Sequence, residues 1–318
     1  MTTNAKGLMV GLAVAILVLG LALSSWWQRG SQGELVAGFN AEFLTRPDGY
    51  PGLAEVYDLR FARSPRQMDT GLMYRACAEG AVDIICGFAT DGRIEAYDLV
   101  TLEDDRNFFP PYYAAPLARR ETLQAYPVVR ELLHELAGKV DDETMRRLNL
   151  QVDREDNPRS AAAVARDFLL EQELIEAEAP TGDGSAGSLR VGGKDFTEQN
   201  ILGEMVAQLI EYNTDLHVER SLYLGGTMIC FNALRSGDLD LYVEYTGTGL
   251  VNILQQEVAA DPREVYDTVS REFSERYDLE WLPPLGFNNT YTLTTRRELA
   301  REYNLHTISD LARVLRQP

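Results

Sequence analysis

The order of apolar, polar and glycine residues over 191–249 constrains the fold of this chain more than any other feature. A strand-like segment leads into the glycine-rich polar turn VGGKDFT, and an apolar stripe at helical spacing follows over 201–210. Further on, residues 238–245 alternate between polar and apolar side chains, as in a half-buried strand, and end on Tyr245. Because α/β folds place ligands where strand ends and helix starts meet, we expect a binding site at these turns.

The same pattern occurs once more, 157 residues earlier, so that Thr70 corresponds to Thr227. In both copies a helical segment is followed by a glycine, an aspartate, an apolar strand and an aromatic residue, which is Phe88 in one copy and Tyr245 in the other. Two matching units at one offset favour two similar α/β lobes, each presenting an aromatic ring at the end of a strand. The alternative is two ordinary α/β units without a shared site.

Composition argues against several classes of function. The 318 residues, 45% of them hydrophobic, leave room for two lobes, and the net charge of −19 argues against nucleic acid as a partner. The three histidines and three cysteines show no metal-ligand spacing, so we expect no metal, and Cys77 and Cys86 should be buried free thiols. The sequence contains no recognisable nucleophile–base pair or phosphate-binding loop, so it supports neither an enzyme nor a bound cofactor.

An uncharged apolar run at residues 7–25 is about long enough to span a bilayer. Trp26, Trp27 and Arg29 follow it, as is typical of a membrane interface. We expect a single transmembrane anchor with the body of the chain outside the cytoplasm; a cleavable signal peptide is the competing interpretation. A second segment, 176–188, is rich in Pro, Gly, Ser and acidic residues, as is typical of a linker.

Eight segments together resemble one protein family. They are VGGKDFTEQ, EYTGTG, PLGFNNTY, RPDGYPGL, MDTGLMY, FATDGRI, DLVTLEDD and FFPPYYAAP. These segments are similar to those of the substrate-binding proteins of ABC importers for quaternary ammonium compounds (glycine betaine, choline, carnitine), and the similarity covers nearly all of 35–175 and 189–315. The family begins with the half containing GGKDFTEQ, which comes second here, so the chain resembles a circularly permuted member. The alternative is a remnant of two tandem copies, whose halves complete each other within one chain or between two chains.

The resemblance implies an α/β, two-lobed periplasmic-binding-protein-like fold of type II, preceded by the N-terminal transmembrane helix. The expected division is one lobe from 35–92 plus 287–318, the other from 93–175 plus 189–286, and 176–188 as a linker that joins the family's usual termini. The chain would cross between the lobes near 88–95 and 286–293, where a hinge lets them close on a ligand. We expect a monomer, or a dimer whose subunits exchange halves.

The resemblance also implies the residues of a ligand site. A quaternary ammonium group cannot donate a hydrogen bond and is bound by aromatic faces, whereas a ligand carboxylate needs cationic and hydroxyl donors. The positions matching the aromatic box are Tyr245, Tyr291, Phe88 and Tyr112, and those matching the carboxylate-binding residues are Lys194, Arg46 and Thr248. The family commonly has tyrosine where Phe88 stands, so this chain keeps the ring and lacks the hydroxyl. The alternatives are core packing for Tyr112, beside Tyr113, and turn or capping roles for Arg46 and Thr248.

We therefore expect a membrane-anchored, extracytoplasmic solute-binding protein that binds a small quaternary ammonium compound. Its partner would be an ABC permease in the membrane, with the ATPase on a separate chain because no Walker motif is present. The alternative is a sensory ectodomain that binds the same solutes without transport.

Overall fold

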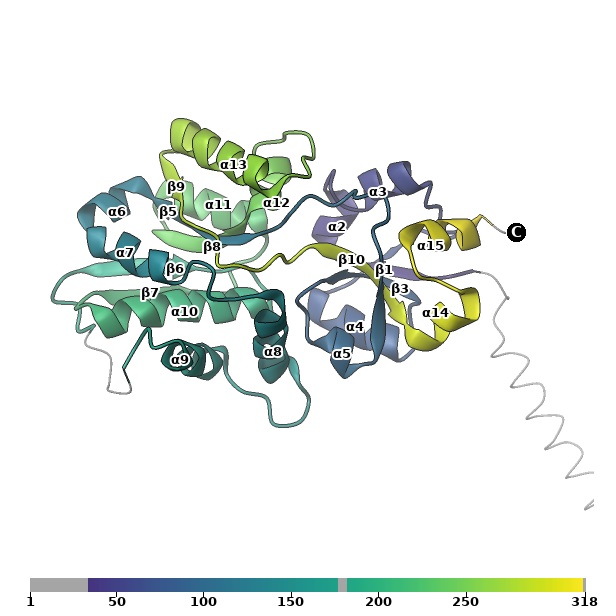
Figure 1. Ribbon diagram of the computed structural model, residues 1–318, viewed down its shortest axis with the longest axis horizontal. Helices are drawn as coiled ribbons and strands as arrows, with labels where there is room; N and C mark the ends of the chain where they lie inside the picture. The colour runs from purple at the N-terminus through teal and green to yellow at the C-terminus, as the bar shows by residue number, and fades with distance from the viewer. Residues whose placement is uncertain (1–33, 177–181, 317–318) are drawn as a thin grey trace, which may run out of the picture.

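The computed structural model describes residues 34–176 and 182–316 of the chain. These residues form two lobes side by side, each built on a five-stranded sheet with helices packed against it (Figure 1). The expected anchor at 7–25 lies outside the described residues. Within the described ranges, no helix combines the length and the apolar character needed to cross a membrane.

The first lobe contains the sheet β2-β1-β3-β10-β4. Its strands are β1 (Ala37–Phe39), β2 (Arg66–Gln67), β3 (Ile84–Phe88), β4 (Leu99–Leu102) and β10 (Tyr291–Arg296). Its helices are α2 (Ala41–Thr45), α3 (Tyr50–Tyr57), α4 (Thr70–Ala78), α5 (Arg93–Ala96), α14 (Arg297–Tyr303) and α15 (Ile308–Leu315). Cys77 in α4 and Cys86 in β3 are buried free thiols, as the sequence predicts.

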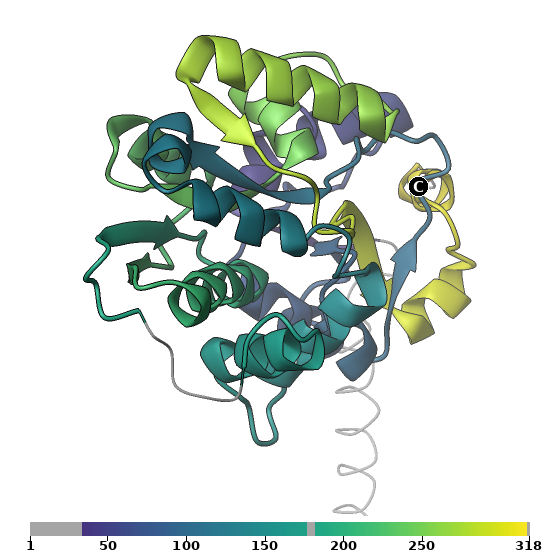
Figure 2. The same ribbon diagram turned by 60° about the vertical axis from the view of Figure 1, so that its left-hand side comes forward.

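The second lobe contains the sheet β7-β6-β8-β5-β9. Its strands are β5 (Ala114–Arg119), β6 (Ser188–Gly192), β7 (His217–Ser221), β8 (Leu241–Tyr245) and β9 (Leu279–Trp281). Its helices are α6 (Arg120–Ala125), α7 (Pro127–Glu135), α8 (Asp142–Asp153), α9 (Ala161–Glu171), α10 (Thr197–Asn213), α11 (Thr227–Ser236), α12 (Thr246–Thr248), the π-helix η1 (Gly249–Ile253) and α13 (Pro262–Tyr277). Helices α10 and α13 lie on opposite sides of this sheet (Figures 1 and 2).

The two sheets have the same design, as the repeated sequence pattern predicts. In the first lobe β1 and β3 are parallel and β10 runs antiparallel to β3; in the second lobe β6 and β8 are parallel and β5 runs antiparallel to β8. The repeated units α4–β3 and α11–β8 end in the central strands of their sheets. The antiparallel neighbour of each central strand comes from the segment that crosses over from the other lobe. The predicted two-lobed α/β architecture is therefore confirmed.

One expected lobe boundary is wrong. Residues 93–102 belong to the first lobe, because β4 pairs with β10 in the register Leu293↔Leu102 to Arg296↔Leu99. That pairing buries Leu99 and Leu102 at the edge of the first sheet. The chain crosses to the second lobe after Leu102 rather than near 88–95.

The return crossing lies beside the outgoing one. The amide of Asn289 donates to the carbonyl of Tyr112 at 3.1 Å, and the amide of Tyr112 donates to Asn288 Oδ1 at 2.7 Å. The two crossing segments thus meet between the lobes, as Figure 1 shows.

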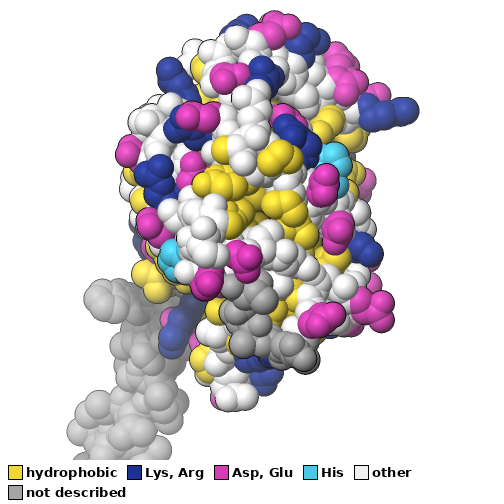
Figure 3. All heavy atoms as spheres, turned by 90° about the vertical axis from the view of Figure 1, so that its left-hand side faces the viewer, with side chains coloured by type: hydrophobic (Ala, Val, Ile, Leu, Met, Phe, Trp, Pro, Cys, Tyr) yellow, Lys and Arg dark blue, Asp and Glu magenta, His cyan; other side chains and the backbone are white. Residues whose placement is uncertain are grey.

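Charged side chains of both signs are mixed on the outer end of the second lobe, where they surround a central group of hydrophobic side chains (Figure 3). The net charge of −19 is therefore not gathered into one acidic patch on this face.

Candidate ligand-binding site

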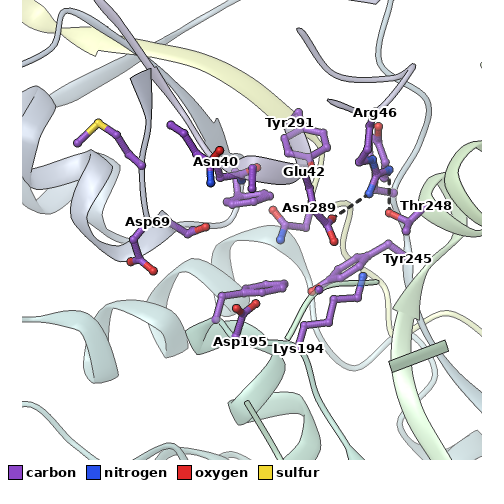
Figure 4. Close-up of a pocket in the computed structure, with 18 residues that line it drawn as sticks. Asn40, Glu42, Arg46, Asp69, Lys194, Asp195, Tyr245, Thr248, Asn289 and Tyr291 are labelled. Carbon is purple, nitrogen blue, oxygen red and sulfur yellow. Dashed lines mark hydrogen bonds and ion pairs between the residues drawn. The ribbon is translucent and has the colours of Figure 1, made fainter. Parts of the chain in front are cut away.

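A cleft of about 440 Å³ lies between the two lobes. All seven residues proposed from the sequence line it: Arg46, Phe88, Tyr112, Lys194, Tyr245, Thr248 and Tyr291. Figure 4 shows several of them converging from opposite sides of the cleft. The structure brings these side chains together, while their contact with a ligand remains a prediction.

The aromatic residues of the cleft contact one another in series. Tyr112 meets Tyr291 edge to face with centroids 5.6 Å apart, and Tyr291 lies 5.2 Å from Phe88. Phe88 stacks on Phe196 at 5.8 Å with nearly parallel planes, and Phe196 lies 6.4 Å from Tyr245. We call these five rings the aromatic arc.

The fold accounts for this arc. Phe88 and Tyr245 end the equivalent strands β3 and β8, so the repeat predicted from the sequence places one ring on each side of the cleft. Tyr291 begins β10 and Tyr112 lies just before β5, so the other two rings come from the crossing segments. Of the adjacent pair, Tyr112 rather than Tyr113 lines the cleft.

Phe196 is the ring that sequence reasoning missed. It occupies the N-cap position of α10, at the end of the glycine-rich turn, and lies between Phe88 and Tyr245. Phe196 lies within GGKDFTEQ, one of the segments that resemble the family, and this position was the only indication in the sequence that it could line the site.

Arg46 is a buried cation with its charge already compensated. Its guanidinium binds Asp48 through Nε at 2.8 Å and Nη2 at 2.5 Å, and it also donates to Thr248 Oγ1 at 3.2 Å. Asp48 in turn accepts the hydroxyl of Tyr112 at 2.7 Å. Burial disfavours the charge of Arg46, but Tyr291 and Asp48 outweigh it and hold its pKa above the usual value.

Lys194, in the second lobe, is also paired with a buried carboxylate. Its Nζ lies 2.6 Å from Glu244 Oε1, donates to Thr227 Oγ1 at 3.0 Å and sits 5.1 Å from the centre of the Tyr245 ring. An ammonium group has three N–H donors, and Glu244 and Thr227 take two of them. Lys194 also lines the cleft.

Glu42 joins the two lobes across the cleft and was not anticipated from the sequence. It belongs to α2 of the first lobe, and its carboxylate accepts the backbone amide of Thr227, the first residue of α11 in the second lobe, at 2.7 Å. It also lies 3.4 Å from Arg46 (Figure 4). Burial raises the pKa of Glu42, but Lys194, Arg46 and Thr227 act more strongly together and lower it below the usual value.

The charges around the cleft favour a cation. The basic side chains that line it, Arg46 and Lys194, each face a buried carboxylate. Three acidic side chains also line the cleft: Glu42, Asp69 and Asp195. A cleft with more carboxylates than free cations and an arc of aromatic faces suits an apolar, positively charged ligand.

Comparison with known proteins finds similar sequences over both lobes. Residues 24–171 and 187–317 match the family described as the substrate binding domain of ABC-type glycine betaine transport system. The chain is 40% identical over 147 residues to a glycine-betaine-binding protein of Pseudomonas aeruginosa, which covers 46% of this chain and 45% of that protein. It is 37% identical over 134 residues to the carnitine transport binding protein OpuCC of Listeria monocytogenes, covering 42% and 44%.

A crystal structure of a glycine betaine/carnitine/choline ABC transporter is similar at 33% identity and a TM-score of 0.35, over 44% of this chain and 50% of that one. The chain thus spans a little under half the length of the curated relatives it matches, at 44% and 45%. Because the family match extends over both lobes, the chain belongs to the family of substrate binding domains of ABC-type glycine betaine transport systems.

Proposed function

We propose that this protein is the extracytoplasmic, membrane-anchored solute-binding component of an ABC importer for quaternary ammonium osmoprotectants such as glycine betaine, choline and carnitine. The observation that carries the proposal is the aromatic arc in the cleft between the lobes. The membership of the family supports it.

The arc supplies the chemistry that such a ligand requires. The methyl groups of a quaternary ammonium ion carry the positive charge and offer no N–H, so the ion gains nothing from hydrogen-bond acceptors. It is attracted to the electron-rich faces of aromatic rings, by about 2 kcal/mol or more per contact when water is excluded. Tyr245, Tyr291, Phe88 and Tyr112 are the box residues in this proposal, with Phe196 as a fifth.

A carboxylate on the ligand would be bound beside the arc, at the end of the cleft where Lys194 lies 5.1 Å from the centre of the Tyr245 ring and Arg46 lies 5.6 Å from the centre of the Tyr291 ring. Lys194 has one N–H to offer beyond Glu244 and Thr227, and the hydroxyl of Thr248 and the guanidinium of Arg46 lie together at 3.2 Å. Since both cations already face carboxylates, we expect this end to add less affinity than the arc.

Closure of the lobes would trap the ligand. Glu42 and Arg46 of the first lobe already contact Thr227 and Thr248 of the second lobe around the cleft. The two crossing segments provide the only covalent links between the lobes within the described ranges, so they are the proposed hinge.

We also propose that the chain is circularly permuted. The family match falls into two blocks that flank 172–186, near the predicted linker, and each curated relative matches less than half of its own length. A monomer by light scattering would support permutation within one chain, whereas an obligate dimer would support exchange of halves.

Calorimetric titration of the purified chain, in mild detergent, tests the proposal. We expect one glycine betaine, choline or carnitine to bind per chain. Absence of heat with all three ligands, from protein that unfolds cooperatively, would refute the assignment. Permease and ATPase genes beside this one would favour import, whereas a neighbouring chemoreceptor or kinase gene would favour the sensory alternative.

A further inference from the structure

Glu198 is a buried carboxylate directly behind the aromatic arc. It lies in the first turn of α10, is 3% exposed and is not among the residues that line the cleft. Its hydrogen-bond donors are Thr90 Oγ1 at 2.5 Å, Asn149 Nδ2 at 3.0 Å, Tyr245 OH at 2.7 Å and Asn289 Nδ2 at 2.8 Å. These donors come from both lobes and from the returning crossing segment.

The charge of Glu198 is not compensated by a cation. Over residues 34–176 and 182–316, no basic side chain forms an ion pair with it, in contrast to Asp48 and Glu244, which are paired with Arg46 and Lys194. Burial raises the pKa of Glu198 above its usual value, and the four hydrogen bonds offset this only in part. Each of its oxygens accepts two donors, which is the arrangement that an ionised carboxylate requires.

The hydroxyl of Tyr245 connects Glu198 to the cleft through a hydrogen bond. The side-chain amide of Gln199 donates to the Tyr245 oxygen at 3.1 Å, so the phenolic proton is directed at Glu198. A hydroxyl that donates to a carboxylate forms a strong, charge-assisted bond and shifts electron density toward its own oxygen and ring. Since a cation is attracted by the negative ring face, the bond strengthens the attraction of Tyr245 for a cation.

We propose that Glu198 is a specificity-determining positioning residue: acting through Tyr245, it gives the cleft its preference for permanently charged quaternary ammonium ligands over neutral molecules of the same shape. This inference rests on the proposed function. Glu198 does not touch the ligand in this scheme. It fixes the ring of Tyr245 and adds a buried negative charge directly behind that ring.

The test compares choline with 3,3-dimethyl-1-butanol, which has the same shape and no charge. Both are titrated calorimetrically into the full chain, and the ratio of their affinities is the readout. Glu198→Gln keeps the size of the side chain and removes the charge, so we expect choline to bind about tenfold more weakly while the neutral alcohol changes little. Glu204→Gln is the matched control, because Glu204 lies on the same helix and pairs with Arg220 away from the cleft.

Each outcome is decisive. Equal losses for the two ligands, or an unchanged ratio, would overturn the role of Glu198 in specificity. If Glu198→Gln does not fold, Tyr245→Phe keeps the ring and removes the hydroxyl, and the same fall in the ratio is expected; an unchanged ratio there would overturn the proposal. A native chain that binds neither choline nor glycine betaine would instead refute the proposed function itself.

Discussion

Lys194→Met should destabilise the second lobe by about 3 kcal/mol, near the lower end of the cost of breaking a buried ion pair. The pair is short, at 2.6 Å, with Lys194 5% exposed and Glu244 fully buried. Loss of the ammonium would leave the fully buried carboxylate of Glu244 without a cation. The cost should not reach the upper end of the range, because the hydroxyl of Tyr242 at 3.0 Å and the amide of Tyr245 at 2.7 Å would still donate to Glu244.

Urea denaturation of four proteins measures this effect as a change in the free energy of unfolding. Lys139→Met is the control, since Lys139 is exposed and forms no ion pair among the described residues, and it should change stability by less than about 0.5 kcal/mol. Lys194→Met/Glu244→Gln should recover most of the loss, because no unpaired charge remains. If the single variant lost less than about 1 kcal/mol, or the double variant were no more stable than the single one, the pair would not be a structural element.

Three further changes test the cleft. Gly92→Ala would place a Cβ 2.8 Å from the backbone nitrogen of Leu150 on α8, so it should push the first lobe away from the second at this contact. We expect choline to bind about tenfold more weakly as a result, and small-angle scattering that showed an unchanged radius of gyration would contradict this. Glu42 has a lowered pKa, so its stabilising effect is complete above the usual value of 4.5 and is lost as the pH falls through the folded value; the unfolding free energy of Glu42→Gln should therefore depend less on pH in that window. Tyr245→Ala should cost choline about 1–2 kcal/mol or more of binding free energy, and calorimetry that found unchanged affinity would show that Tyr245 does not bind the ligand.

The sequence predicted the two lobes because they depend on a short, regular pattern, whereas the seven proposed cleft residues came from the resemblance of their segments to the family. The repeated helix–glycine–aspartate–strand unit identified β3 and β8 and the rings at their ends, Phe88 and Tyr245. Residues 93–102 were assigned to the wrong lobe because their place depends on pairing with β10, which lies almost two hundred residues away in the chain. No local pattern encodes that partner.

The residues missed in the site have the same explanation. Glu42 and Thr227 are 185 residues apart, and Thr90 and Glu198 are 108 apart, so their contacts exist only once the lobes are packed together. In the sequence, each of these carboxylates looks like an ordinary acidic residue near the start of a helix. Phe196 was hidden for a different reason, since a lone aromatic in a turn is as compatible with packing as with a ligand.

The pairing of charges around the cleft determines how its residues can be tested. Arg46 and Lys194 each contribute both to the fold, through Asp48 and Glu244, and to the proposed site. Removal of either cation therefore lowers stability and affinity together, and a loss of binding alone would not identify a ligand contact. The ratio of the affinities for two ligands that differ in one group is free of this problem, because destabilisation of the fold weakens the binding of both ligands alike. If Lys194 binds a ligand carboxylate, its removal must weaken glycine betaine more than choline; equal losses would assign Lys194 to the structure alone.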